Sequence, residues 1–380
     1  MTDSPATDSS ASYKAAGVDY DALDAGKRMA MARALATSPL LSERGGQARD
    51  ASRGEPAFVF DFDGRTFAFV VEGLGTKSIV ARLLYERHGV NRFADVAYDT
   101  VAAILNDLAC VGALPLVVNA YFATGASEWY LAADRAAALL EGWQQACLDA
   151  GCAWGGGESP SLPGLVSAED IELAGAAVGA VPRGRAAILG EDLRVGDEIV
   201  LIASSGLHAN GASLARLLAD RLPDGYATAL PSGRSLGEAL LDSSVMYVSL
   251  VQALLESDLK ISYLSHITGH GLLKLMRPPR SFTYRMSNLP PVPEVLTFLA
   301  DKAGLEAHAA YSTFNMGAGY AIYCAAGSGS AVVAIARQLG LDALVAGLVE
   351  DGPRRVIVEP IDVVYDGAEL EFAASQRPHG

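Results

Sequence analysis

The sequence predicts an α/β protein built from two layered domains, and three observations support this prediction. The chain has 380 residues, of which 51% are hydrophobic, which is enough for two domains that each bury a core. Strand-type and helix-type stretches alternate along both halves, as they do in layered α/β domains. The segment Pro182-Arg183-Gly184-Arg185 between the halves is typical of a hinge. We therefore expect an N-terminal domain over residues 13–183 and a C-terminal domain over residues 184–365.

The elements of the first half follow from apolar periodicity and from turn residues. Residues 1–12 are polar, and we expect them to form a disordered tail. Residues 38–56 are rich in Gly, Ser and Arg, which predicts a loop. Asp63-Gly64 lies between two β-type runs and predicts a hairpin. The predicted helices cover residues 20–35, 78–87, 95–111 and 131–150, and the predicted strands cover residues 57–62, 66–71, 114–122 and 171–181.

The second half shows the same alternation after the hinge. Its first strand leads into a glycine-containing turn and then into a helix. The predicted strands cover residues 198–204, 263–266, 320–324 and 343–350, and the predicted helices cover residues 212–220, 245–256, 271–277, 293–303 and 330–339. We expect residues 366–380 to form a second tail.

Charge and composition argue against several classes of protein. The chain has 29 Lys and Arg against 44 Asp and Glu, so its formal charge is −15 and its pI is about 4.8. This balance argues against a nucleic-acid partner, which requires a basic surface, and leaves an anionic small-molecule substrate possible. No apolar run approaches the ~20 residues of a membrane helix, and residues 1–12 lack the features of a secretion signal. The four cysteines show no metal-binding spacing, which favours free thiols in a reducing cytoplasm.

The segment Glu72-Gly-Leu-Gly-Thr-Lys77 links a predicted strand to a predicted helix. Gly73 and Gly75 allow a ligand to approach the backbone closely, and Thr76 and Lys77 open a helix whose N-terminus favours anions. Glu72 could hold a divalent cation while Lys77 contacts a phosphate. An ordinary strand-to-helix turn with a solvated lysine explains the segment equally well.

Asp99, Asn106 and Asp107 interrupt an otherwise apolar helix. Their spacings of seven and eight residues correspond to two helical turns, so their side chains lie roughly on one face. Oxygen ligands on one face suit Mg²⁺, which binds carboxylates together with waters and substrate phosphates. The alternative is that these residues cap or solvate the helix.

Several glycine-rich turns follow strands in both halves. Gly155-Gly156-Gly157-Glu158 could approach a ligand or could be a flexible loop. Ser204–Gly211 could cradle a phosphate, with His208 exchanging a proton, or could be a capped helix start with a surface histidine. His266 and His270 lack a third ligand, so we expect no zinc site there. No local signature of a covalent nucleophile is found, and the turns together indicate a nucleotide and metal site assembled from many loops.

The order of these turns resembles that of phosphoribosylformylglycinamidine cyclo-ligases, also called aminoimidazole ribonucleotide synthetases. The resemblance runs from about Ser12 to Glu359. The segments that carry it are Ser12-Tyr13-Lys14-Ala-Ala-Gly17-Val18-Asp19, Glu72–Lys77, Asn106-Asp107, Gly156-Gly157-Glu158, Ser205-Gly206-Leu-His208-Ala-Asn210-Gly211, Thr268-Gly269-His-Gly271 and Phe314-Asn315-Met-Gly317.

The resemblance implies two domains of the PurM-like superfamily, with the N-terminal sheets of two subunits joined in a homodimer. It also implies a step of purine synthesis in which ATP phosphorylates the formyl amide oxygen of formylglycinamidine ribonucleotide. The iminophosphate then closes to aminoimidazole ribonucleotide and phosphate leaves. By resemblance, Mg²⁺ is held by Glu72, Asp99 and Asp107. By resemblance, Lys77 contacts a phosphate, His208 transfers a proton and Asn210 takes part in the reaction. The resemblance also places six residues at the nucleotide or substrate, and they are Gly73, Gly75, Thr76, Asn106, Gly157 and Glu158.

This chain departs from the family pattern at several of the same positions. Glu72 replaces the usual Asp, and the N-terminal glycine loop is reduced to Gly45-Gly46. Ser159, His270 and Met316 replace the usual Thr, Gly and Cys. Two alternatives to the cyclo-ligase therefore stay open. One is a paralogue that phosphorylates another amide, carboxylate or phosphate-bearing substrate, and the other is a non-catalytic nucleotide-binding dimer.

Overall fold

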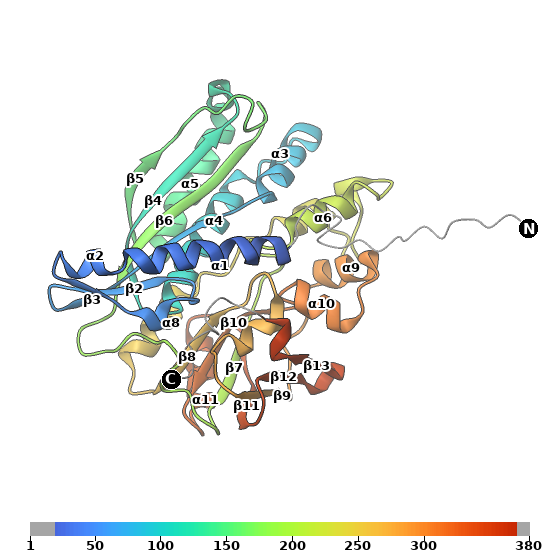
Figure 1. Ribbon diagram of the computed structural model, residues 1–380. Helices are drawn as coiled ribbons and strands as arrows, with labels where there is room; N and C mark the ends of the chain where they lie inside the picture. The colour runs from blue at the N-terminus through green and yellow to red at the C-terminus, as the bar shows by residue number, and fades with distance from the viewer. Residues whose placement is uncertain (1–19, 371–380) are drawn as a thin grey trace, which may run out of the picture.

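The computed structural model describes residues 20–370, which form two domains, each built on one sheet (Figure 1). Both domains pack helices against their sheet, so the predicted α/β class with two layers is confirmed. The expected tail over residues 1–12 lies outside the described residues. Residues 366–370, expected in the second tail, form the end of a strand and a short 3₁₀ helix, Gly367–Glu369.

The N-terminal domain carries a six-stranded sheet among the described residues. Its strands are β1 (Gly46–Ala48), β2 (Phe58–Phe62), β3 (Arg65–Gly73), β4 (Leu114–Thr124), β5 (Ala153–Glu158) and β6 (Ile171–Ala180). Their order in space is β1-β2-β3-β6-β4-β5, antiparallel except for the parallel pair β4 and β5. The helices are α1 (Tyr20–Thr37), α2 (Pro39–Ser42), α3 (Lys77–His88), α4 (Phe93–Ala109) and α5 (Ala133–Asp149).

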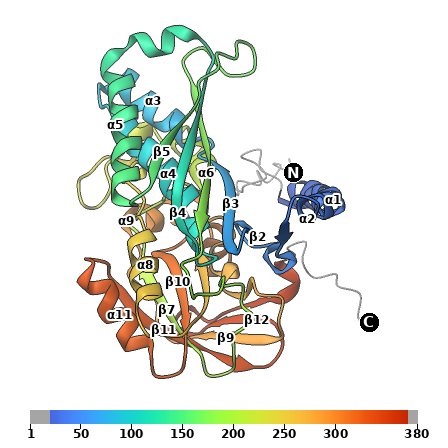
Figure 2. The same ribbon diagram turned by 90° about the vertical axis from the view of Figure 1, so that its left-hand side faces the viewer.

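The N-terminal sheet is covered by helices on one face only. Along β3, Ala68 and Val70 are buried on the side of α4, whereas Phe69 and Val71 on the other side are 44% and 62% exposed. Figure 2 shows α4 and α5 on one side of this sheet, with α1 and α2 standing away from it on the other. The alternation follows from the two-residue period of a strand. The uncovered face is unusually apolar for a surface exposed to water.

The C-terminal domain carries a seven-stranded sheet in the part of the chain that the structure describes. Its strands are β7 (Glu198–Ala203), β8 (Ile261–His266), β9 (Phe282–Met286), β10 (Ala318–Cys324), β11 (Ala343–Asp351), β12 (Arg355–Val358) and β13 (Val363–Asp366), in the order β13-β12-β9-β11-β7-β10-β8. The helices are α6 (Ala212–Ala219), α7 (Leu236–Leu240), α8 (Val248–Glu256), α9 (Glu294–Ala303), α10 (Ala307–Thr313) and α11 (Gly329–Gln338). Every residue of β10 is buried, because β7 and β8 flank it and the domain core surrounds it.

Some predicted elements differ from the observed ones. The expected loop over residues 38–56 contains α2 and β1, and β1 forms only through its pairing with β2. The glycine run Gly155–Gly157 lies within strand β5, although glycine disfavours strands, because it pairs with β4. The predicted helix over residues 271–277 is a 3₁₀ helix, Gly271–Met276. Strands β9, β12 and β13 and helices α7 and α10 were not predicted.

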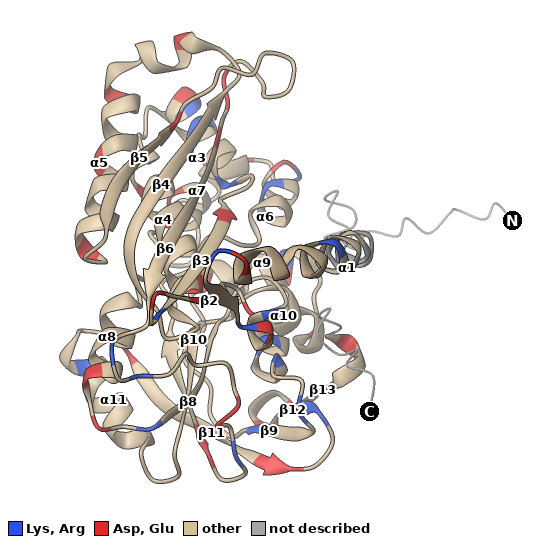
Figure 3. Ribbon diagram, turned by 60° about the vertical axis from the view of Figure 1, so that its left-hand side comes forward, with Lys and Arg blue, Asp and Glu red and all other residues tan. Residues whose placement is uncertain are grey.

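Surface charge and hydropathy give two further findings. Lys and Arg lie scattered over both domains among more numerous Asp and Glu in Figure 3. Within residues 20–370, the helices are all too short or too polar to cross a membrane.

Candidate active site at the domain junction

The polar face of α4 forms the junction with the C-terminal domain. Asp99, Asn106 and Asp107 are all buried, and they lie on one face as the helical spacing predicts. Asp99 Oδ1 accepts a hydrogen bond from the Ser244 amide at 2.6 Å. Asn106 accepts from the Tyr247 amide and donates to the Val245 carbonyl, both at 2.8 Å. This face therefore holds the segment that leads into α8.

Lys77 begins α3 and is fully buried. Its ammonium lies 2.5 Å from Asp99 Oδ2, and both side chains have no exposed area. The same ammonium donates to the His208 carbonyl at 2.8 Å. Nearby, the hydroxyls of Thr76 and Ser213 lie 2.9 Å apart. The structure therefore brings the Glu72–Lys77 turn and the Ser204–Gly211 turn together across the domain boundary.

The His208 imidazole is held as a neutral hydrogen-bond donor. Its Nε2 accepts from the Ser205 amide at 3.2 Å and lies 3.1 Å from the Ser205 hydroxyl. Because Nε2 uses its lone pair there, the ring proton resides on Nδ1. Nδ1 is buried and has no hydrogen-bond partner among residues 20–370. Burial, assisted by the charges of His266 and Lys77, holds the pKa of His208 well below its ordinary value.

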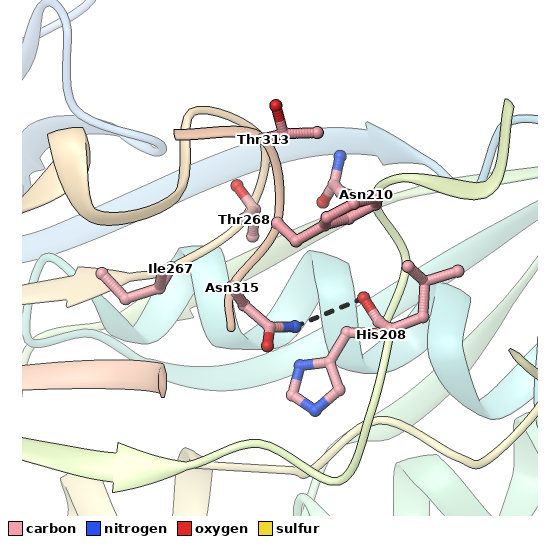
Figure 4. Close-up of a pocket in the computed structure, with 8 residues that line it drawn as sticks. His208, Asn210, Ile267, Thr268, Thr313 and Asn315 are labelled. Carbon is pink, nitrogen blue, oxygen red and sulfur yellow. Dashed lines mark hydrogen bonds between the residues drawn. The ribbon is translucent and has the colours of Figure 1, made fainter. Parts of the chain in front are cut away.

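A small pocket opens beside His208 (Figure 4). Its volume is about 10 Å³, room for little more than one water molecule. The lining residues come from three loops, and they are Leu207, His208, Asn210, Ile267, Thr268, Thr313, Phe314 and Asn315. Asn210 is exposed, whereas Asn315 is buried and donates to the Gly206 carbonyl at 2.8 Å.

The backbone around this pocket is strained. His208, His270 and Met316 have φ values of 59°, 73° and 44°, in the left-handed region that non-glycine residues rarely adopt. Such strain is concentrated at functional sites, because the surrounding structure must compensate for it. Three of the five described non-glycine residues with positive φ are thus in or next to the loops that line one pocket.

A second set of charged side chains adjoins the pocket at Thr268, and the pairing of Asp107 with His266 in this set was not predicted. Asp107 Oδ1 and His266 Nδ1 are 2.7 Å apart. Burial alone would raise the pKa of Asp107, but the His266 hydrogen bond and nearby positive charges hold it below its ordinary value. The buried Lys274 ammonium donates to the Thr268 hydroxyl. Only the position of Lys274 in an apolar run, Leu272–Met276, could have indicated its role.

Glu72 of β3 and the glycine run of β5 lie at the same end of their strands. The register aligns Glu72 with Gly175, Ala120 and Gly157, and Gly73 with Glu158, in rows across β3, β6, β4 and β5. Three strand spacings separate Glu72 from Gly157, which is about 14 Å. Because neighbours along a strand point to opposite faces, Glu72 points to the helix-covered face and Glu158 to the uncovered face. Gly157 has no room for a side chain, since a Cβ would lie 2.1 Å from the Ala120 carbonyl oxygen.

The residues present do not fit a magnesium ion held jointly by Glu72, Asp99 and Asp107. Asp99 is committed to Lys77 and Ser244, and Asp107 is committed to His266. Among residues 20–370, no group of three His, Cys, Asp or Glu side chains could hold a metal ion. The geometry instead shows two of these carboxylates binding the chain's own donors.

Comparison with known proteins shows that both domains match the same protein family. Residues 54–181 match the family described as "AIR synthase related protein, N-terminal domain", and residues 194–359 match its C-terminal counterpart. A phosphoribosylformylglycinamidine cyclo-ligase from Anaeromyxobacter sp. strain Fw109-5 is 37% identical over 76% of this chain and 82% of its own length. A protein of the same name from Carboxydothermus hydrogenoformans is 31% identical over 91% of this chain and 98% of its own length.

Solved structures share the fold at low sequence identity. An E. coli hydrogenase maturation protein, HypE, has a TM-score of 0.55 and 20% identity over 83% of this chain and 86% of its own. A thiamine-monophosphate kinase from Stenotrophomonas maltophilia has a TM-score of 0.54 and 21% identity over 79% and 90%. A HypE structure solved in complex with ATP has a TM-score of 0.55 and 17% identity over 81% and 86%.

Proposed function

The chain belongs to the AIR synthase related family, and on that premise we propose that it is an ATP-dependent cyclo-ligase. Its substrate is formylglycinamidine ribonucleotide, and its product is aminoimidazole ribonucleotide. The observation that carries this proposal is the meeting of two turns across the domain boundary, where the Lys77 ammonium contacts the His208 carbonyl at 2.8 Å. The chain also spans 82% and 98% of two relatives that bear the cyclo-ligase name.

The proposed reaction proceeds in two steps that balance. The γ-phosphoryl group of ATP is transferred to the formyl amide oxygen, which gives ADP and an iminophosphate. A substrate nitrogen then attacks the activated carbon, the C–O bond breaks, and inorganic phosphate leaves as the ring closes and a proton is lost. Such chemistry requires binding, orientation and charge stabilisation rather than a protein nucleophile.

The side chains of the pocket suit this chemistry. The His208 Nδ1–H donates to a ligand oxygen that develops negative charge, because it has no acceptor in the part of the chain that the structure describes. Asn210, at the exposed rim, binds the substrate. Lys77 acts by positioning the His208 backbone, in addition to its predicted phosphate contact. Proton transfer by His208 would require a change of its hydrogen bonds.

The nucleotide contacts remain those proposed from the family motifs. Gly73, Gly75 and Thr76 offer backbone and hydroxyl groups at the turn before α3, and Gly157 and Glu158 lie at the same end of the sheet's strands. Asn106 is buried at the domain junction and acts indirectly, by holding Val245 and Tyr247 in place. Magnesium enters with ATP as the counterion of its phosphates, since Asp99 and Asp107 are engaged elsewhere. The four buried thiols favour a cytoplasmic location.

We propose that the uncovered face of the N-terminal sheet forms a homodimer. Phe62, Phe69, Val71, Leu116 and Tyr121 are between 37% and 62% exposed on this domain. A contiguous apolar face of this kind marks an interface. Phe69→Asp should convert the dimer to a monomer in sedimentation velocity, whereas Leu339→Asp on the C-terminal domain, 42% exposed, should leave it unchanged. A wild-type monomer would contradict the proposal.

The reaction is tested by ATP turnover with and without formylglycinamidine ribonucleotide, with aminoimidazole ribonucleotide assayed directly. We expect equal amounts of ADP and product from the wild type. His208→Gln should lose activity, whereas His308→Gln, at a half-exposed histidine, should keep it. A His208→Gln variant with wild-type turnover would remove this residue from the mechanism.

A second candidate is a paralogue that uses the same ATP chemistry on another substrate. The observation that favours it is the set of unusual residues at the junction, Glu72, His270 and Met316, two of which adopt strained backbone conformations. ATP binding without formation of aminoimidazole ribonucleotide would support this candidate over the cyclo-ligase. Failure to bind ATP would leave only a dimeric scaffold without catalysis.

A further inference from the structure

The backbone and the ring of His208 are held by separate contacts. The backbone is held through its carbonyl, which accepts from the Lys77 ammonium at 2.8 Å. The ring is held through Nε2, which accepts from the Ser205 amide at 3.2 Å and lies 3.1 Å from the Ser205 hydroxyl. The amide proton is fixed in the peptide plane, so a proton on Nε2 would point at it. The neutral ring is therefore confined to the form with its proton on Nδ1.

The Ser205 hydroxyl is itself fixed by the segment that leads into α8, and that segment is tied to α4. The Ser205 hydroxyl donates to the Ser243 carbonyl at 2.6 Å. The Ser243 hydroxyl in turn donates to Asp95 Oδ1 at 2.7 Å. Asp95 Oδ2 lies 2.7 Å from Arg92 Nε at the start of α4, and the same guanidinium donates to the Leu241 carbonyl at 3.1 Å. A continuous chain of polar contacts thus runs from α4 across the domain boundary to the imidazole.

Helix α4 therefore controls His208 in two ways. Asp95 and Asp99 are four residues apart, which is about one helical turn. Asp95 acts on the ring through the two serines, whereas Asp99 acts on the backbone through its pair with Lys77. His208 has a φ of 59°, and a non-glycine residue keeps this conformation only when its surroundings hold it there.

We propose that Ser205 and Ser243 are positioning residues that, together with Asp95, fix the ring orientation and the Nδ1–H tautomer of His208. His208 lines the pocket, and its Nδ1 has no hydrogen-bond partner among residues 20–370. If the proposed function holds, the chain of contacts keeps this N–H ready for the reacting oxygen, so its loss lowers the rate of the reaction. That consequence rests on the proposed function, whereas the fixed tautomer does not.

The experiment records two-bond ¹H–¹⁵N spectra of the full chain, labelled with ¹⁵N-histidine, at pH 7.5 without ligands. His208→Gln assigns the ring signals, and we expect the wild-type ring to carry its proton on Nδ1. Ser205→Ala and Ser243→Ala should each shift the tautomer ratio toward Nε2–H by about three- to tenfold, as for the loss of one hydrogen bond. Ser205→Thr, which keeps the hydroxyl, should retain the wild-type ratio. Ser232→Ala is the matched control, because this exposed serine also donates to a carboxylate, that of Glu294.

A kinetic measurement tests the consequence for the reaction. In ATP turnover with formylglycinamidine ribonucleotide, Ser205→Ala should lower kcat by about three- to tenfold and leave the KM for ATP within about twofold. Ser205→Thr and Ser232→Ala should keep the wild-type kcat.

Three results would overturn the inference. The first is a wild-type His208 ring with its proton on Nε2, and the second is a wild-type tautomer ratio in both Ala variants. The third is a shifted ratio with an unchanged kcat, which would remove the chain of contacts from the reaction. If Ser243→Ala does not fold, Ser205→Ala, at an exposed position, decides the question alone. A wild type that makes no aminoimidazole ribonucleotide would contradict the proposed function, while the spectra without ligands would still decide whether the serines fix the tautomer.

Discussion

Removing the Lys77 charge should destabilise the folded protein, whatever it does to activity. The Lys77 and Asp99 side chains have no exposed area and lie 2.5 Å apart. Lys77→Met leaves the Asp99 carboxylate buried without its counterion and removes the donor to the His208 carbonyl. Breaking a buried pair from one side costs about 3–5 kcal/mol, which is a large part of a typical total stability of about 5–15 kcal/mol.

The assay is urea unfolding of the full chain, followed by tryptophan fluorescence. The double variant Lys77→Met/Asp99→Asn should recover much of the loss, because it removes both charges while keeping an oxygen for the Ser244 amide. Arg194→Met is the control. It breaks a pair with Asp192 whose side chains are 63% and 61% exposed, and it should cost about 0–1 kcal/mol. The reasoning fails if Lys77→Met costs no more than Arg194→Met, or if the double variant is no more stable than Lys77→Met.

Three further predictions use other features of the structure. The pKa of His208 in the folded protein lies below the ordinary 6.5, so the unfolded chain binds an extra proton at low pH. The free energy of unfolding should therefore fall as the pH drops through about 6.5, and urea midpoints measured between pH 5 and 7.5 should show this loss. His208→Gln should reduce the pH dependence. Gly157→Ala places a Cβ 2.1 Å from the Ala120 carbonyl oxygen and should lower the free energy of unfolding by about 1–3 kcal/mol. Gly26→Ala, which has open space around it, should not lower it. Equal free energies of unfolding for the two variants would refute this prediction. Burial raises the pKa of the four thiols, to about 11 for Cys147 and about 12 for the others. A thiol reagent at pH 8 should therefore label none of them in the folded protein and all four after unfolding. Rapid labelling of the folded protein would contradict their burial.

Local patterns in the sequence predicted much of the fold but few of the contacts that the polar residues make. The helical spacing of Asp99, Asn106 and Asp107 correctly placed them on one face of α4. Their partners, Ser244, Tyr247 and His266, lie about 140 to 160 residues further along the chain, and no local pattern reveals contacts at that separation.

Some of the elements that the sequence did not predict depend on pairing with a distant strand. Strand β5 contains Gly155, Gly156 and Gly157, which have no strand propensity of their own, and its place is set by the register with β4. Strand β1 likewise exists through its partner β2. Lys274 was overlooked because a single lysine in an apolar run is usually solvated, whereas here its ammonium is buried and donates to the Thr268 hydroxyl.

The polar face of α4 also constrains the order in which the chain matures. The acceptors at Asp95, Asp99 and Asn106 receive their donors from Ser243 to Tyr247, which the ribosome delivers more than 130 residues later. Until then the emerging N-terminal half carries an unsatisfied polar strip next to its own apolar core. A fragment ending at residue 183 should therefore be degraded or aggregate in cells, unless the missing half is supplied in trans, and co-expression of the two halves would measure this directly.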